Sequence, residues 1–126
     1  MNVKIDTREK FHVITILEKG FAANMTAELD NCLLPLLQNG VKNVILNLKD
    51  IQNIDNAAAE RLTELQQTFY DNNSSFVICC LSDDLEETLD EYGFLELMNC
   101  TPTESEAGDI VQMEEIEREW GVGTPE

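Results

Sequence analysis

The sequence predicts a single α/β domain with a mixed central β-sheet of four to five strands and about four helices. Short aliphatic runs of strand length alternate with longer segments whose apolar residues recur every three or four positions. Strands separated by helices need crossover connections, so the sheet must be at least partly parallel. The chain has 126 residues, 43% of them hydrophobic, which is enough for one core.

The first part of the chain predicts a strand pair, a helix and a central strand. Residues 2–6 and 11–17 alternate in polarity and flank a charged turn, as the strands of a hairpin do. A helix is expected from Thr26 to Asn39, and Pro35 inside it should kink or split it because proline cannot donate a backbone hydrogen bond. The run from Asn43 to Leu48 is apolar on both faces, as a central strand requires.

The second part predicts three more helices and one or two strands. A helix begins near Asp55 or Asn56, either of which can cap it, and residues 75–81 form a second buried strand. Ser82 caps the next helix, and a short edge strand is expected over residues 99–101. The last helix follows a capping-box pattern. The apolar positions along it are Ile110, Met113, Ile116 and Trp120.

The expected order of elements is β-β-α-β-α-β-α-(β)-α. We assign residues 1–118 to the domain and expect residues 119–126 to form a flexible tail. No apolar run approaches the ~18 residues of a membrane span, so no membrane insertion is predicted. The N-terminus has no apolar block after its charges, and without a signal peptide we expect a cytoplasmic protein.

The charge is strongly negative and unevenly distributed. The net charge is −17, and residues 83–126 contain 15 acidic side chains and 1 basic one. Such a surface repels phosphate backbones and anionic lipids, so nucleic-acid binding is not expected. The acidic half is either a well-solvated helical face or a patch that steers a basic partner.

No catalytic, cofactor or metal site is predicted. His12 is the only imidazole, and a single histidine in a strand is more often packed than catalytic. Neither GxGxxG nor GxxxxGK[ST] occurs, so no loop is available to bind phosphates. Elimination leaves a binding module and not an enzyme.

The cysteines predict no metal site either. They are Cys32, Cys79, Cys80 and Cys100, and their spacing does not match that of zinc ligands. Small buried thiols in a reducing compartment are expected. Because Cys79 and Cys80 are adjacent in a strand-like run, their side chains should point to opposite faces.

Five segments together give the chain a resemblance to the STAS domain family, the bacterial anti-sigma-factor antagonists. The segments are VITILEKG, VILNLKDIQNID, the helix that starts at Asn56, FVICCLS and DDLEETLDEYGFLELM. The resemblance covers about residues 3–118. It implies a STAS-like fold and a protein partner.

The family resemblance also implies where that partner binds. In the family, the turn before the second long helix usually reads Asp-Ser/Thr-Ser-Gly-Leu. Its first hydroxyl residue is phosphorylated by a partner that is both serine kinase and anti-sigma factor, and the phosphate switches binding off. The matching positions here are Asp55, Asn56, Ala57, Ala58 and Ala59. Only the aspartate agrees, and Asn56 occupies the phosphorylation position.

Two interpretations follow from this departure. In the first, the chain is a regulatory domain that docks an anti-sigma factor or serine kinase through these five positions and is constitutively competent. In the second, it is an acidic scaffold or accessory STAS subunit that binds another protein, such as a transporter or a signalling component. The acidic residue often found in the family's loop after the second strand is also missing, since Phe21, Ala22 and Ala23 occupy that loop.

Overall fold

The computed structural model describes residues 1–120 of the chain. Five strands form the main sheet in the spatial order β1-β2-β4-β6-β7. Their bounds are β1 (Val3–Thr7), β2 (Phe11–Ile16), β4 (Asn43–Asn47), β6 (Phe76–Cys79) and β7 (Cys100–Thr101). β1 runs antiparallel to β2, and the other neighbouring pairs are parallel. The predicted α/β class, the mixed sheet and the order of elements are confirmed.

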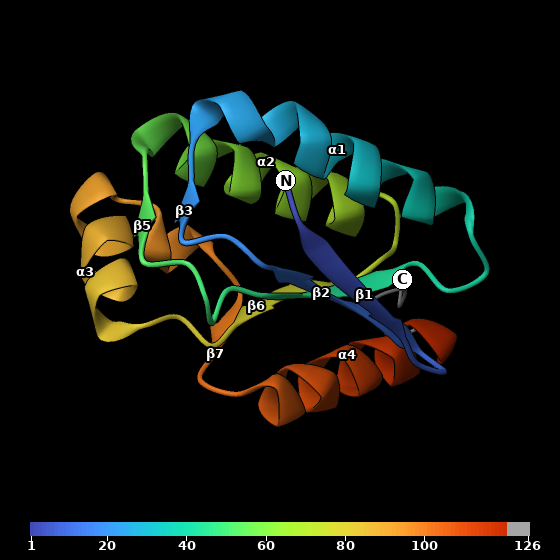
Figure 1. Cartoon of the computed structure of the whole chain (residues 1–126). Coiled ribbons are helices and arrows are strands. Elements are labelled where there is room, and N and C mark those ends of the chain that lie inside the picture. The colour runs from blue at the N-terminus through green and yellow to red at the C-terminus, as the bar shows by residue number, and fades with distance from the viewer. Residues whose placement is uncertain (121–126) are drawn as a thin grey trace.

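Helices cover both faces of this sheet (Figure 1). α1 (Thr26–Leu33) and α2 (Asn56–Asp71) lie on one face, and α4 (Glu104–Glu119) lies on the other. α3 (Asp83–Tyr92) lies at one end, beside the short strand β5 (Asn53–Ile54). The domain therefore has three layers.

Proline splits the first helical segment, as predicted. α1 ends at Leu33, and the chain continues as a 3₁₀ helix over Leu34–Gln38 with Pro35 in its first turn. The proline ring suits the start of a new helical segment because no N–H is needed there. The sequence pattern did not predict a second sheet, in which β3 (Gly20–Phe21) runs parallel to β5. Strands of two residues are too short to show a period.

The central strand β4 is buried along its whole length. Val44 and Leu46 belong to the core under α1 and α2, whereas Ile45 packs on the other face with Val13 and Val77. This alternation is the period of a pleated strand. β4 therefore holds both helical layers together.

Of the apolar positions predicted along the last helix, Ile110 packs against the cluster that contains Ile45, and the other three do not face the core. Met113 and Ile116 are each 55% exposed, and Trp120 is 79% exposed. The side of α4 that meets the sheet consists of the small residues Ala107 and Val111, with Gly108 beside them. At 100° per residue these positions lie on the opposite side of the helix from the three exposed residues.

α4 lies close to the sheet on this side. An added Cβ on Gly108 would lie 3.4 Å from the Phe11 ring, an ordinary van der Waals contact, so the ring packs directly against the helix at this point. Polar side chains then anchor the helix at both ends of β4. Asn47 donates a hydrogen bond to Glu104 at 3.1 Å, and Asn43 donates one to Glu115 at 2.5 Å.

The buried side chain of Asn43 joins α4 to the starts of two neighbouring strands. Its amide nitrogen donates to Glu115 and to the Lys10 carbonyl at 2.9 Å. Its carbonyl oxygen accepts from the Ser75 N–H at 2.8 Å and from Arg118 at 3.2 Å. The side chain thus links β4 to the residues just before β2 and β6 and to the end of α4.

The two edges of the main sheet differ. β7 is only two residues long, Pro102 follows it, and the preceding Asn99 N–H donates to the side chain of Gln66 on α2 at 2.8 Å. β1 forms the other edge with five residues, and its Ile5 is half exposed. β7 is therefore the short, covered edge.

The adjacent cysteines do not point to opposite faces, and that prediction is wrong. β6 ends at Cys79, and Cys80 has a φ of 67°, outside the strand region. This left-handed turn brings the Cys80 sulfur to 3.6 Å from the Cys79 sulfur.

The predicted tail stays a prediction. Residues 119–126 were assigned to it, and Glu119 is the last residue of α4. Residues 121–126 lie outside the described part of the chain.

Replacing Asn43 by alanine should lower the free energy of unfolding by about 2–3 kcal/mol, because it leaves buried polar groups without partners. Urea unfolding measures the loss. The matched control is Gln112→Ala, an exposed position on α4, which should change stability by less than about 0.5 kcal/mol. Equal effects of the two substitutions would contradict the anchoring role.

Candidate functional site

An aspartate starts α2. Asp55 has extended backbone angles, and its Oδ1 accepts a hydrogen bond from the Ala58 N–H at 2.8 Å. The first turn of a helix leaves backbone N–H groups without partners, and a carboxylate at the cap both accepts one and suits the positive end of the helix dipole. The sequence prediction of a cap at Asp55 or Asn56 is resolved in favour of Asp55.

The same carboxylate holds a second loop in place. Asp55 Oδ2 accepts a hydrogen bond from the Ala23 N–H at 3.0 Å. The Asp55 N–H in turn donates to the Phe21 carbonyl at 3.3 Å. The loop after β3 and the start of α2, 32 residues apart in sequence, therefore lie side by side.

The small sheet explains why these loops can approach so closely. Gly20 pairs with Asn53, and an added Cβ on this glycine would lie 2.6 Å from the Asn53 side-chain oxygen. That oxygen is the far end of an exposed side chain that can turn away, so the backbone pairing itself brings the two strands together. β3 and β5 thus form the base on which the two loops rest.

The five predicted partner-binding positions divide into two groups. Asp55, Asn56 and Ala57 are exposed. Ala58 and Ala59 are each 0% exposed and belong to the core under α2. Only the first three can contact a partner directly, while the two buried alanines let the helix pack closely on the sheet.

The loop after β3 adds residues that the motif comparison did not select. Ala23 and Asn24 are exposed beside the start of α2. The hydroxyl of Thr26 donates to the Ala23 carbonyl at 2.8 Å and so helps to fix this loop. The sequence pattern gave no sign of this proximity, because it depends on the pairing of β3 with β5. We call the surface of Ala23, Asn24, Asp55, Asn56 and Ala57 the α2-start surface.

Two further contacts fix the elements around this surface. Arg61 on α2 forms a two-pronged ion pair with Asp30 on α1, with its Nε 3.0 Å from one carboxylate oxygen. The hydrogen bonds that Arg61 donates to Asp30 raise the pKa of the Arg61 guanidinium. The Tyr92 hydroxyl donates to the Ile54 carbonyl at 3.2 Å and so joins α3 to β5. Both helices next to the α2-start surface are therefore held by side-chain contacts.

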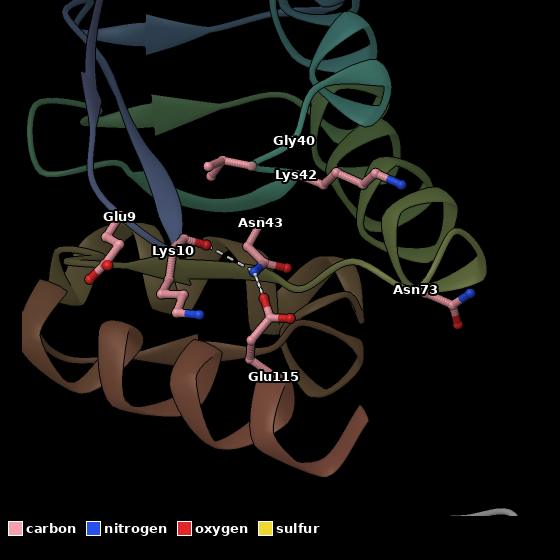
Figure 2. Close-up of a pocket in the computed structure, with 8 residues that line it drawn as sticks. Glu9, Lys10, Gly40, Lys42, Asn43, Asn73 and Glu115 are labelled. Carbon is pink, nitrogen blue, oxygen red and sulfur yellow. Dashed lines mark hydrogen bonds between the residues drawn. The ribbon is translucent and has the colours of Figure 1, made fainter. Parts of the chain in front are cut away.

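A hollow of about 340 Å³ lies at the amino end of β4 and is lined mainly by charged and amide side chains (Figure 2). Lys10, Asn43 and Glu115 point toward one another there, and the Asn43 amide already donates to the other two residues. The Asn43 amide and the Glu115 carboxylate are therefore committed to the fold.

Other chemical groups are also engaged in structure. The two ring nitrogens of buried His12 lie 2.9 Å from the Thr7 hydroxyl and from the Val41 carbonyl. Within residues 1–120, no three histidine, cysteine, aspartate or glutamate side chains are grouped so that they could hold a metal ion. No helix in the described part of the chain is long and apolar enough to cross a membrane.

The protein is a three-layer α/β domain. At its α2-start surface, the Asp55 carboxylate accepts hydrogen bonds from two backbone N–H groups. The STAS domain model matches residues 2–107. The chain belongs to the STAS domain family, and the resemblance seen in the sequence is confirmed. The match ends four residues into α4, so most of that helix lies beyond the matched part.

Solved structures show the same fold at low sequence identity. A candidate anti-sigma factor antagonist from Thermotoga maritima has a TM-score of 0.73 at 14% identity, over 87% of this chain and 94% of that one. The anti-sigma factor antagonist SpoIIAA in its unphosphorylated form has a TM-score of 0.65 at 14% identity, over 96% and 98%. A sulfate transporter family protein from Wolinella succinogenes has a TM-score of 0.71 at 18% identity, over 86% and 90%. No curated protein matches the chain.

The Asp55 carboxylate can be tested by a graded pair of substitutions. Asp55→Ala removes both acceptors and should lower the free energy of unfolding by about 2 kcal/mol. Asp55→Asn keeps one oxygen and should lose about half as much. Urea unfolding compares both with Asp50→Ala, at an exposed position of the preceding turn. A loss for Asp55→Ala no larger than for the control would show that the two loops are held by other contacts.

Proposed function

We propose that this chain is a non-enzymatic regulatory domain that binds a protein partner through its α2-start surface. The observation that supports this most is the double hydrogen bond of Asp55 to the N–H groups of Ala58 and Ala23. It holds two loops in one arrangement while leaving their side chains exposed. A surface fixed before binding loses little conformational entropy when a partner docks.

The partner implied by the family resemblance is an ATPase that acts both as serine kinase and as anti-sigma factor. The positions of the family motif coincide with the exposed start of α2, which supports docking there. Asn56 occupies the first helical position, next to the capping aspartate. An amide cannot form the phosphate ester that a serine or threonine forms, so phosphorylation at this position does not interrupt binding. In this proposal the domain is constitutively competent.

Site-directed photo-crosslinking tests this binding mode. A photo-reactive amino acid in place of Ala57 should form a covalent adduct in the source cells with an ATPase of the kinase-like anti-sigma class. Adding Asn56→Arg should lower the adduct yield at least about tenfold, since a bulky charge in a docking surface easily costs 1.4 kcal/mol.

The matched control carries the photo-reactive residue at Asn31, which is exposed on α1. It should give no such adduct. The same adducts from both positions, or none from Ala57 in a folded chain, would overturn docking at the α2-start surface.

One structural observation favours the second function, that of an acidic accessory subunit. Met113, Ile116 and Trp120 form an exposed apolar stripe along α4, and exposed acidic side chains flank it at Asp109 and Glu117. Large apolar side chains that are more than half exposed and share one face mark an interaction surface. The flanking charge selects a partner of opposite sign. The partner that fits is an amphipathic helix whose apolar face is bordered by lysine or arginine.

The single tryptophan of the chain reports on this surface directly. Because Trp120 is 79% exposed, a basic amphipathic peptide that covers it should shift its fluorescence to shorter wavelength. An acidic peptide with the same apolar positions should not. Raising the salt concentration from 0.05 to 0.5 M should weaken binding, since charge attraction is then screened.

A pair of matched substitutions completes this test. Ile116→Glu should weaken peptide binding at least about tenfold. Leu97→Glu alters an equally exposed apolar side chain outside α4 and should leave binding unchanged. Equal binding of the basic and acidic peptides, or equal effects of the two substitutions, would reject a charge-selective surface on α4.

A further inference from the structure

The carboxyl end of β6 brings two thiols together. Cys79 is the last residue of the strand and is fully buried. It packs on the α4 face of the sheet, with Ala107 and Val111 among its cluster. Cys80 packs against the same cluster and is partly exposed. The two sulfur atoms are 3.6 Å apart, with the Cys80 thiol donating to the Cys79 sulfur.

An unusual backbone conformation creates this pair. In a continued strand, adjacent side chains would point to opposite faces. Cys80 instead has a φ of 67°, and its N–H donates to the Thr101 carbonyl at 3.3 Å. Left-handed backbone is unfavourable for a residue with a Cβ, and cysteine has no side-chain amide or carboxyl group to support it. Such outliers concentrate at functional positions.

The two thiols differ in accessibility. Burial raises the pKa of the Cys79 thiol, and the neighbouring Cys80 thiol raises it further. Cys79 therefore stays protonated at neutral pH and is closed to solvent. Cys80 is the thiol that a dissolved oxidant can reach, because reactivity requires exposure as well as thiolate formation. The pair thus places the accessible Cys80 sulfur in contact with the buried Cys79 sulfur.

We propose that Cys79 and Cys80 form a reversible oxidation site at which a peroxide converts the two thiols into a disulfide between adjacent residues. The Cys80 thiolate attacks one peroxide oxygen, the O–O bond breaks, and Cys80 becomes a sulfenic acid. The Cys79 sulfur then attacks the Cys80 sulfur as its proton leaves, and the S–OH bond breaks to release water. Two thiols lose two electrons, and one hydrogen peroxide becomes two water molecules.

Covalent geometry makes this disulfide labile. Adjacent Cα atoms are about 3.8 Å apart, below the usual 4.4–6.8 Å between Cα atoms joined by a disulfide. The ring that closes is therefore strained and readily reduced, as labile or regulatory disulfides are. The site lies on the α4 side of the sheet and makes no use of the α2-start surface. It stands independently of the proposed function.

The test uses a Cys32→Ser/Cys100→Ser variant, which retains only the pair. Treatment with a small excess of hydrogen peroxide should give a monomer whose intact mass is lower by two hydrogen atoms. Dithiothreitol should restore the original mass. Adding Cys80→Ser should abolish this change, since Cys79 then has no neighbouring thiol. Far-UV circular dichroism before oxidation shows that both variants are folded.

A second measurement uses the wild-type protein and so does not depend on whether a substituted protein folds. After oxidation, blocking of free thiols and proteolysis, the peptide that contains Cys79 and Cys80 should carry no blocking group and lack two hydrogens. Gain of oxygen without loss of hydrogen, a disulfide between two chains, or an unchanged pair at a dose that oxidises Cys32 would each overturn the proposal.

Discussion

The structure depends on the burial of β4 on both faces. Its aliphatic residues alternate between the core under α1 and α2 and the smaller core under α4. The strand begins and ends with asparagines, Asn43 and Asn47, and both direct their side chains to α4. A strand with no solvent-exposed face must provide hydrogen-bond partners for its polar ends within the protein. The hydrogen bonds of Asn43 and Asn47 therefore help to position α4 on the sheet, together with the apolar contact of the helix.

The sequence was sufficient to predict the fold but not which side of α4 packs on the sheet. Strand runs, caps and the proline in the first helical segment are local signals, and they predicted the order of elements. Along α4 the apolar period of Met113, Ile116 and Trp120 is real, yet Ala107, Gly108 and Val111 are the residues that pack on the sheet. Which side of the helix contacts the sheet depends on the distance between them and on the residues of the sheet. The spacing of apolar residues along the helix carries no information about either.

The candidate site could be predicted only as far as its position in the chain. Asp55 was recognised because a capping aspartate before a helix is a local pattern. Its second hydrogen bond, to the Ala23 N–H, depends on the pairing of two strands of two residues each, which leaves no periodic signal. Similarly, the motif groups Ala58 and Ala59 with Asn56 as partner-binding positions, although the two alanines are buried and Asn56 is exposed. The left-handed conformation of Cys80 was not predicted, because the residue at which β6 ends depends on its pairing with β4 and β7.

The unequal edges of the sheet restrict how this domain can associate by strand addition. At β7 the backbone pairs over only two residues before Pro102, and the Gln66 side chain occupies the Asn99 N–H. A further strand would find few free groups there. The β1 edge is longer, but Lys4 and the ion pair of Asp6 with Arg8 place charge along it. Short edges and charged edges both discourage the joining of sheets between molecules.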